Sequence, residues 1–388
     1  MRRNDLTALL ASKEMVLVCG SGGVGKTTTA AAMAVAAAVE VGGRVLVLTV
    51  DPARRLADAL GVGALGNTAT RVDPAAFAEA GVTPRGELWA AMLDTKAGWD
   101  ELIRRHAPDA RTRDAVLANP LYQNITARFV HSHDYLAMER LHELHASGEY
   151  DLIVVDTPPS RNALDVLDAP GRMKEFFGSK LLRWLTVPYR SRLFTMASKP
   201  FYQVADKVLG SRFLEDIAEF FMLFQAMEKG FVAHAREVEQ LLADPRTTFV
   251  VVSTLEAAPT HEAAFLAREL ARRDLHLGAI VANRTLPEAF TAKASANSAR
   301  KLERAADGPL ADEVLDEIGD VPGVDRDVVV GVLTEVATRF HDIAVVATRE
   351  AERRSDLAGL ASIVVSCPML EGDVNDLADL YRLTKAFA

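Results

Sequence analysis

Cysteine is nearly missing from this chain of 388 residues, which contains only Cys19 and Cys367. Two thiols cannot form a disulfide framework, and they are too few to build a thiolate metal site within one chain. Such scarcity is typical of proteins that stay in a reducing compartment. We therefore expect a reduced, cytoplasmic protein.

An excess of positive charge is also lacking, because 44 lysines and arginines face 53 aspartates and glutamates, a formal net charge of -9. The chain as a whole has no electrostatic footprint for nucleic acid, so we expect no nucleic-acid partner. No uncharged apolar run approaches the roughly 18 residues that a membrane-spanning helix needs. Any membrane contact is expected to be peripheral or to pass through a partner.

The chain does have the composition of a globular protein, with 49% hydrophobic and 25% charged residues. Short, nearly continuous apolar runs bounded by turn residues are typical of strands buried on both faces of a parallel sheet. Segments long enough for helices separate most of them, such as residues 27–41 and 261–273. This alternation predicts an α/β fold with a doubly wound, mostly parallel sheet. The runs are MVLVC from Met15, RVLVLTV from Arg44, DLIVVD from Asp151, TFVVVS from Thr248, LGAIVAN from Leu277 and SIVVS from Ser362.

Two stretches interrupt the alternation and look helical. We expect one domain over residues 1–388, with a helical insert subdomain at residues 172–242 and a second helical segment at residues 287–352. The insert holds nine of the sixteen phenylalanines, from Phe176 to Phe231. There is no internal repeat and no second phosphate-binding sequence, so a reaction that needs two such sites needs two chains.

One short segment carries a specific chemical signal. Gly20, four further residues, Gly25, Lys26 and Thr27 match the G-x-x-x-x-G-K-[ST] pattern of P-loop NTPases, between an apolar strand and an alanine-rich helix. The backbone N–H groups of such a loop and the helix N-terminus face phosphate oxygens. We expect Lys26 to reach the β- and γ-phosphates and Thr27 to bind magnesium. The residues expected to contact the nucleotide here are Gly20, Ser21, Gly22, Gly23, Val24, Gly25, Lys26, Thr27 and Thr28.

Two acids stand at the ends of predicted strands. Asp51 follows VLVLTV, and Asp156 follows LIVV and leads into TPPS. Either acid alone would be interpreted as a cap of a helix or turn. Because both accompany a phosphate loop at the sheet edge where α/β proteins bind ligands, we favour a role at magnesium and at the attacking water.

Five stretches, taken together, resemble the ArsA/GET family of dimeric ATPases, which includes the arsenite-pump ATPase and the targeting factor for tail-anchored membrane proteins. They are GSGGVGKTT, TVDPARRLADALG, DLIVVDTPPS, IVANR and CPMLEGDVNDL. The resemblance spans nearly the whole chain in the right order. It implies a magnesium-dependent ATP hydrolase that works as a dimer, with ATP and Mg²⁺ as cofactors.

The resemblance also implies roles for single residues. Asp51 would position the attacking water beside the metal, and Asp156 would hold magnesium through water. Asn283, at a strand end, matches the family's adenine-reading asparagine, and its amide can pair with the polar edge of adenine. Taken alone, Asn283 would be interpreted as a turn residue. The loop that covers the base would be formed by Pro368, Met369 and Leu370.

One position departs from the family pattern. A lysine that reaches the partner's phosphates usually stands where this chain has Ser21. A cation supplied in trans accelerates phosphoryl transfer by roughly 10³ to 10⁵ in other enzymes, which is about 4 to 7 kcal/mol. Arg54 or Arg55 could replace it, a lysine-bearing paralogue could complete a heterodimer in place of a homodimer, or hydrolysis could simply be slow. We favour the paralogue.

The cysteine count removes two other family features. Without a C-x-x-C pair there is no thiolate zinc clamp between subunits, and without clustered cysteines arsenite transport is disfavoured. The HELH sequence from His142 to His145 lacks the H-E-x-x-H pattern, so it is interpreted as an ordinary helix surface.

The phenylalanine-rich insert can be read as a packed subdomain or as a groove for an apolar protein client. Phe220, Phe221, Phe224 and Met227 fall on adjoining helical turns, and Met222 adds an adaptable thioether. Upstream, basic residues mix with Trp184, so the segment is either a solvated lid edge or a peripheral membrane contact.

We expect an ATPase whose nucleotide-driven dimer closure switches an apolar helical surface for a client or partner. Two alternatives remain: an ATP-binding, weakly hydrolysing regulatory subunit of a heteromeric ATPase, and a membrane-associated positioning ATPase of the MinD kind. Asp51 argues against the first, and the weak C-terminal sequence LYRLTKAFA argues against the second.

Overall fold

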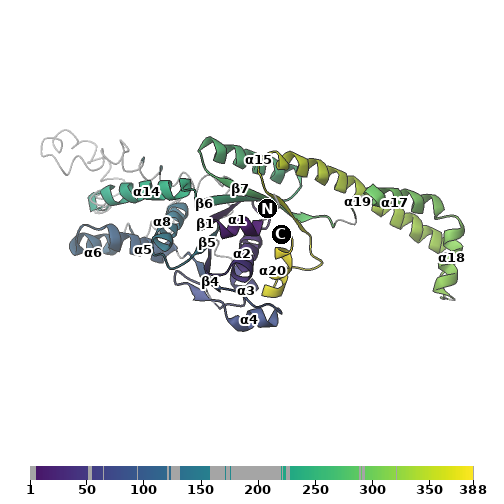
Figure 1. The fold of residues 1–388 in the computed structure, drawn as a ribbon, viewed down its shortest axis with the longest axis horizontal. Helices are drawn as coiled ribbons and strands as arrows, with labels where there is room; N and C mark the ends of the chain where they lie inside the picture. The colour runs from purple at the N-terminus through teal and green to yellow at the C-terminus, as the bar shows by residue number, and fades with distance from the viewer. Residues whose placement is uncertain are drawn as a thin grey trace, which may run out of the picture.

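The computed structural model describes residues 6–50, 55–63, 65–93, 95–119, 122–123, 132–157, 171, 175, 220, 222–223, 228–287, 290, 293–319 and 321–387. Within them, eight strands form one sheet in the order β3-β4-β2-β5-β1-β6-β7-β8. Every neighbouring pair is parallel except the short pair of β3 and β4. The predicted α/β fold with a mostly parallel, doubly wound sheet is confirmed (Figure 1). The strands are β1 (Met15–Cys19), β2 (Arg44–Thr49), β3 (Thr70–Arg71), β4 (Glu87–Met92), β5 (Leu152–Asp156), β6 (Thr247–Ser253), β7 (Leu277–Thr285) and β8 (Val364–Pro368).

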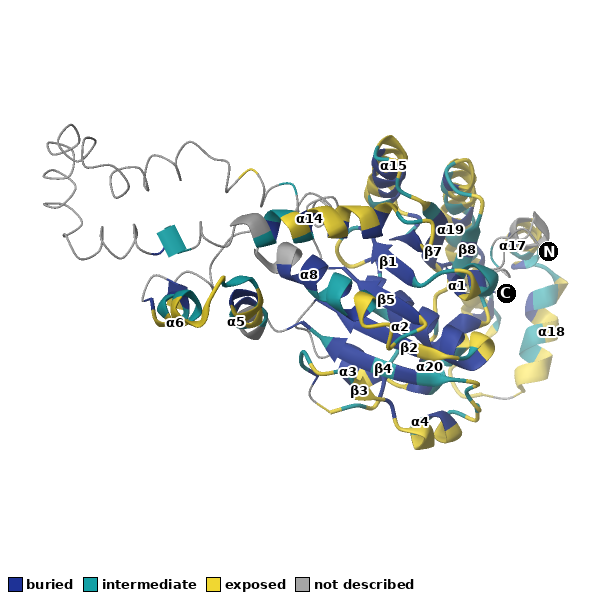
Figure 2. Cartoon of the chain, turned by 60° about the vertical axis from the view of Figure 1, so that its left-hand side comes forward, coloured by how far each residue is buried: buried dark blue, intermediate teal, exposed yellow. Residues whose placement is uncertain are grey.

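Helices cover both faces of the sheet, as the burial colours of Figure 2 show. Successive strand residues point to opposite faces, so Val16 and Val18 of β1 enter one core, while Met15, Leu17 and Cys19 enter the other. The first core is covered by α1 (Leu6–Ala11), α2 (Lys26–Ala36), the π-helical turn η1 (Ala37–Val41), α3 (Arg55–Ala59), α4 (Pro74–Glu79) and α20 (Leu377–Thr384). The second is covered by α8 (Ser132–Ala146), α14 (Glu228–Ala243), α15 (Ala257–Arg272) and the end of α19 (Arg326–Ala358).

The helix α2 lies in the middle of the first core because its sequence KTTTAAAMAVA consists largely of small residues. From Thr29 to Ala36 every side chain is buried. Alanine is the best helix former and leaves room for close approach to the sheet. This packing fixes the start of α2 directly beyond the end of β1.

The six predicted strands are present, with β8 beginning two residues later than the run from Ser362 suggested. The sequence reasoning missed β3 and β4. The strand β4 reads ELWAAM, and its two alanines and its polar first residue conceal it from a search for β-branched runs. It forms a strand because it pairs with β2 along its whole length, from Arg44 opposite Glu87 to Thr49 opposite Met92.

Two helical lobes extend beyond the sheet on opposite sides in Figure 1. One contains α5 (Thr95–His106), α6 (Ala110–Ala118) and parts of α8 and α14, around a small third core that includes Trp99, Ile103 and Phe231. The other contains α17 (Lys293–Ala305), α18 (Pro309–Ile318) and the first part of α19. The second lobe occupies the stretch in which we expected a second helical segment.

Most of the expected insert at residues 172–242 lies outside the described residues, including Phe221, Phe224 and Met227. Its last part forms α14, and Phe220 packs in the third core, 2% exposed. Phe220 is therefore core in this structure, which is the ordinary reading of a helical apolar stripe. Among the described residues, every helix is too short or too polar to cross a membrane.

Candidate functional site

The phosphate loop connects β1, which ends at Cys19, to α2, which begins at Lys26. Two of its glycines are required by close contacts. Gly20 has φ 151° and Gly25 has φ 93°, and a Cβ atom at either would collide with Val252 carbonyl oxygen or with Asn283 Nδ2, respectively. The loop thus curls tightly against Val252 of β6 and Asn283 of β7, and the N-terminus of α2 stays open at the carboxyl edge of the sheet.

Lys26 is almost completely buried, with 6% exposure. Its Nζ donates a hydrogen bond to the carbonyl oxygen of Ser21 across the loop, at 2.9 Å. The ammonium group therefore lies close to the backbone of the phosphate loop, where phosphate oxygens would bind. Ser21 itself contributes this carbonyl, and its hydroxyl has no hydrogen-bond partner among the described residues.

Asp156 ends β5 and faces the first turn of α2. Thr27 Oγ1 donates a hydrogen bond to Asp156 Oδ2 at 2.6 Å, and Thr49 Oγ1 donates to the same oxygen at 3.0 Å. Asp156 is only 1% exposed. Two hydroxyl oxygens and a carboxylate form a set of hard oxygen donors of the kind that Mg²⁺ prefers, so the residues present fit the metal that the sequence predicts. Thr49 is a member of this group that sequence reasoning missed.

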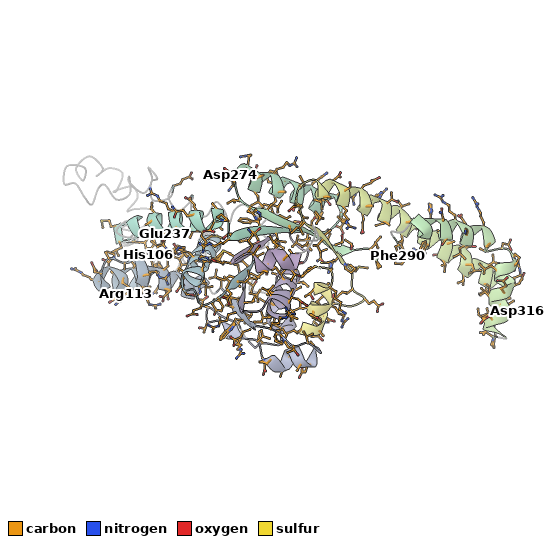
Figure 3. All side chains as sticks on the ribbon, viewed as in Figure 1. His106, Arg113, Glu237, Asp274, Phe290 and Asp316 are labelled. Carbon is orange, nitrogen blue, oxygen red and sulfur yellow. The ribbon has the colours of Figure 1, made fainter. Side chains whose placement is uncertain are left out.

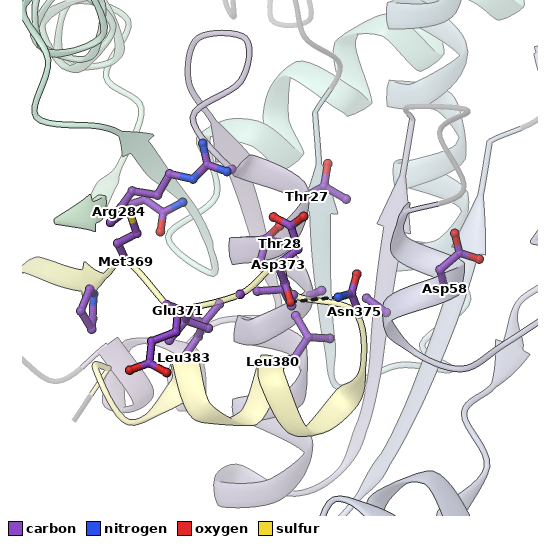
Figure 4. A pocket seen from close by; sticks show the side chains of 18 of the residues that line it. Thr27, Thr28, Asp58, Arg284, Met369, Glu371, Asp373, Asn375, Leu380 and Leu383 are labelled. Atoms are coloured by element: carbon purple, nitrogen blue, oxygen red, sulfur yellow. Dashed lines mark hydrogen bonds between the residues drawn. The ribbon is translucent and has the colours of Figure 1, made fainter. Parts of the chain in front are cut away.

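A cavity of about 790 Å³ opens beside the start of α2. It brings together predicted residues from distant parts of the chain, as Figure 4 shows for Thr27, Thr28 and Met369. Asn283 Nδ2 donates a hydrogen bond to the carbonyl oxygen of Val24 at 2.9 Å, and thus ties β7 to the phosphate loop. The predicted residues that line the cavity are Gly25, Thr27, Thr28, Asn283, Pro368, Met369 and Leu370.

Several lining residues were not singled out from the sequence. Leu380 and Leu383 of α20 form an apolar part of the wall, and Asn375 donates from Nδ2 to the carbonyl oxygen of Asp373 at 3.1 Å in the loop before that helix (Figure 4). The stretch CPMLEGDVNDL pointed to this loop. The contribution of α20 had no sequence signal, because its leucines also follow an ordinary amphipathic pattern.

Other predicted residues cannot be placed at the site. Asp51 and Arg54 lie outside the described residues, and so does the side chain of Arg55, whose backbone begins α3. The expected water-positioning role of Asp51 and the replacement of the missing lysine by either arginine thus remain predictions.

The two thiols are buried near this site and unreactive in character. Burial raises the pKa of Cys19 to about 12, with a smaller opposite effect from its hydrogen bond with Thr157. Burial alone raises the pKa of Cys367 to about 12. Both cysteines are free, as the sequence predicted, and both serve as small core side chains.

Comparison with known proteins gives the family of this chain. The model of the family described as anion-transporting ATPase matches residues 13–321. An uncharacterized protein of Streptomyces coelicolor is 30% identical over 275 residues, which is 70% of this chain and 63% of that protein, so the match spans less than two thirds of its length.

Two relatives are named ATPase GET3. The one from Malassezia globosa is 28% identical over 278 residues, 71% of this chain and 73% of the relative. The one from Schizosaccharomyces japonicus is 25% identical over 338 residues, 86% of this chain and 93% of the relative. Together with the family match and the phosphate loop beside α2, these similarities show that the chain belongs to the anion-transporting ATPase (ArsA) family.

Proposed function

We propose that this protein is a magnesium-dependent ATP hydrolase. The observation that carries the proposal is the 2.6 Å hydrogen bond from Thr27 Oγ1 to Asp156 Oδ2, directly beside Lys26 and the phosphate loop. When Mg²⁺ and ATP bind, the metal would polarise the phosphates. Lys26 would turn from the Ser21 carbonyl to the β- and γ-phosphates, and Thr27 and Asp156 would hold the metal.

The adenine base would enter the cavity beside Asn283. The apolar side chains of Leu380, Leu383 and Met369 suit the faces of a purine, and Asn283 offers a carboxamide for its polar edge. The bond to the Val24 carbonyl uses one of the two N–H groups of Asn283 Nδ2, so the amide nitrogen keeps a second donor for the base. The carboxamide oxygen would accept from the base amino group, and the remaining N–H would donate to a ring nitrogen.

The protein would act as a dimer that closes on ATP. Ser21 carries no charge, so a homodimer would lack the cation that the family usually supplies in trans, and we favour a lysine-bearing paralogue as the partner. Closure would move the helical lobe that contains α5, α8 and α14, and with it a surface for an apolar protein client. A peripheral membrane contact and a cytoplasmic location belong to the same proposal.

The experiment that tests the proposal measures phosphate release from Mg-ATP by the purified chain. Wild type is compared with Ser21→Lys, with Lys26→Ala as a phosphate-loop knockout and with Asp156→Asn. Loss of turnover in Asp156→Asn at unchanged folding supports the metal role. Turnover that is indifferent to Lys26→Ala would show that the activity arises elsewhere.

A regulatory subunit that binds ATP and barely hydrolyses it is the second candidate, and Ser21 is the observation that favours it. Nucleotide binding by calorimetry separates the two. A chain that binds Mg-ATP, stays silent alone, and gains turnover with Ser21→Lys is an ATPase that lacks its partner's cation. A chain that binds Mg-ATP and stays silent even with Ser21→Lys is a regulatory subunit.

A further inference from the structure

A second cluster of metal-binding side chains lies in the helical lobe formed by α5, α8 and α14, outside the phosphate site. Figure 3 marks its place with His106 and Glu237. Two of its helices carry a histidine and a glutamate three residues apart, which places each pair on one helix face. The five residues are His106 of α5, Glu139 and His142 of α8, and His234 and Glu237 of α14.

Three of these side chains converge on one point. Glu237 Oε2 lies 3.8 Å from His142 Nε2 and 3.6 Å from His234 Nε2, and one ligand atom from each residue lies within 4.8 Å of the others. These distances are too long for hydrogen bonds. Zinc bonds of about 2.0 to 2.1 Å hold tetrahedral ligand atoms about 3.3 Å apart, which small side-chain rotations would reach.

A buried carboxylate orients the central histidine. Glu139 is 3% exposed, and its Oε2 lies 2.9 Å from His234 Nδ1. The carboxylate accepts the Nδ1–H of His234, so the lone pair of this imidazole is on Nε2, the nitrogen that faces Glu237. A carboxylate that binds the far nitrogen of a histidine is the usual outer partner of a metal-ligating histidine. The His106 ring packs beside the His234 ring, with their centroids 4.8 Å apart.

The HELH segment of α8 is more buried than the ordinary helix surface that we expect from the sequence. The His142 and His145 side chains are only 21% and 20% exposed. His145 pairs with Glu14, while His142 faces α14. The linear pattern H-E-x-x-H did not apply because the second histidine of the cluster comes from another helix.

We propose that His142, His234 and Glu237 bind one divalent transition-metal ion of the zinc type, with Glu139 as a positioning residue. Two imidazole nitrogens and one carboxylate suit Zn²⁺ and its neighbours in the first transition series, whereas Mg²⁺ prefers oxygen ligands alone. Glu237 is 49% exposed, so water can take the fourth position.

The bound ion would act as a clamp. Residues 142 and 234 lie 92 positions apart in the sequence, and α8 precedes while α14 follows the intervening stretch. A metal ion bound by both helices would cross-link chain positions that are far apart in the sequence, which lowers the entropy of the unfolded chain and so stabilises the folded lobe. The proposed surface for a client belongs to the same lobe, and the clamp itself is independent of ATP hydrolysis.

The test titrates tag-free, chelator-treated protein with Co²⁺ and with Zn²⁺, in the presence of excess Mg²⁺ to fill the proposed magnesium site. We expect one tight site per chain, with the absorption bands of Co²⁺ bound to nitrogen, and a melting temperature that rises with Zn²⁺. His142→Ala and His234→Ala should weaken binding by more than the roughly 10- to 100-fold expected when an outer partner is lost. Glu139→Gln should weaken metal binding by a factor within that 10- to 100-fold range.

Two further variants keep the test decisive. Glu237→Gln changes a half-exposed side chain without changing its shape, so it should fold like the wild type and still lose metal affinity. His261→Ala removes an exposed histidine from α15 and should leave both the affinity and the melting response unchanged. Equal Co²⁺ affinity in wild type, His234→Ala and Glu237→Gln would overturn the proposal, as would wild type that binds no Co²⁺.

Discussion

The contact between Thr49 and Asp156 makes a sharp prediction about the magnesium site. Thr49 lies at the end of β2, is 1% exposed, and donates to Asp156 Oδ2 at 3.0 Å. Thr49→Val keeps the shape and removes this donor, while the Thr27 bond at 2.6 Å stays. A hydrogen bond to a charged group contributes about 1.5 to 3 kcal/mol. If the metal site loses this whole contribution, the apparent affinity for Mg²⁺ in nucleotide binding should fall roughly 10- to 150-fold, at about 1.36 kcal/mol for each factor of ten.

The assay is binding of a fluorescent ATP analogue at increasing Mg²⁺, which needs no hydrolysis. Thr49→Ser is the matched control, because it keeps the hydroxyl and should behave much like the wild type. Nucleotide affinity without Mg²⁺ should change little in either variant. The proposed role of the Thr49 hydroxyl is refuted if Thr49→Val and Thr49→Ser show the same magnesium dependence as the wild type.

Three further experiments test other parts of the structure. Gly25→Ala should abolish nucleotide binding, because Gly25 has φ 93° and the new Cβ would collide with Asn283 Nδ2. Gly331→Ala is the matched control: this glycine lies in an exposed turn of α19 with nothing near the new Cβ, so the free energy of unfolding should rise by about 0.5 to 1 kcal/mol. Cys19 and Cys367, both 2% exposed, should resist a thiol reagent at pH 8 and react fully only in denaturant; rapid labelling of the native protein would contradict their burial. Phe387→Ala should lower the unfolding free energy by about 3 to 5 kcal/mol in a urea titration, since this side chain is fully buried in the core beside α1.

Much of the fold and part of the candidate site could be predicted from the sequence, because the signals were local. The run MVLVC predicts a buried strand, and the spacing from Gly20 to Thr27 predicts a phosphate loop without any knowledge of what lies beside it. The alanine-rich stretch after Lys26 similarly predicts a helix. Each of these features depends on neighbours within a few residues.

The tertiary structure alone decided the rest, because the partners are distant in the chain. The strand β4 forms because it pairs with β2. Thr49 binds Asp156, which lies 107 positions away in the sequence, and α20 completes the wall of the cavity beside α2. His142 and His234 come together only because α8 and α14 pack side by side (Figure 1). The sequence by itself determined the strand and helix pattern and the phosphate loop, since backbone geometry and side-chain periodicity act locally. The second donor on Asp156, the α20 part of the cavity wall and the histidine cluster required the folded chain, since only packing brings such residues together.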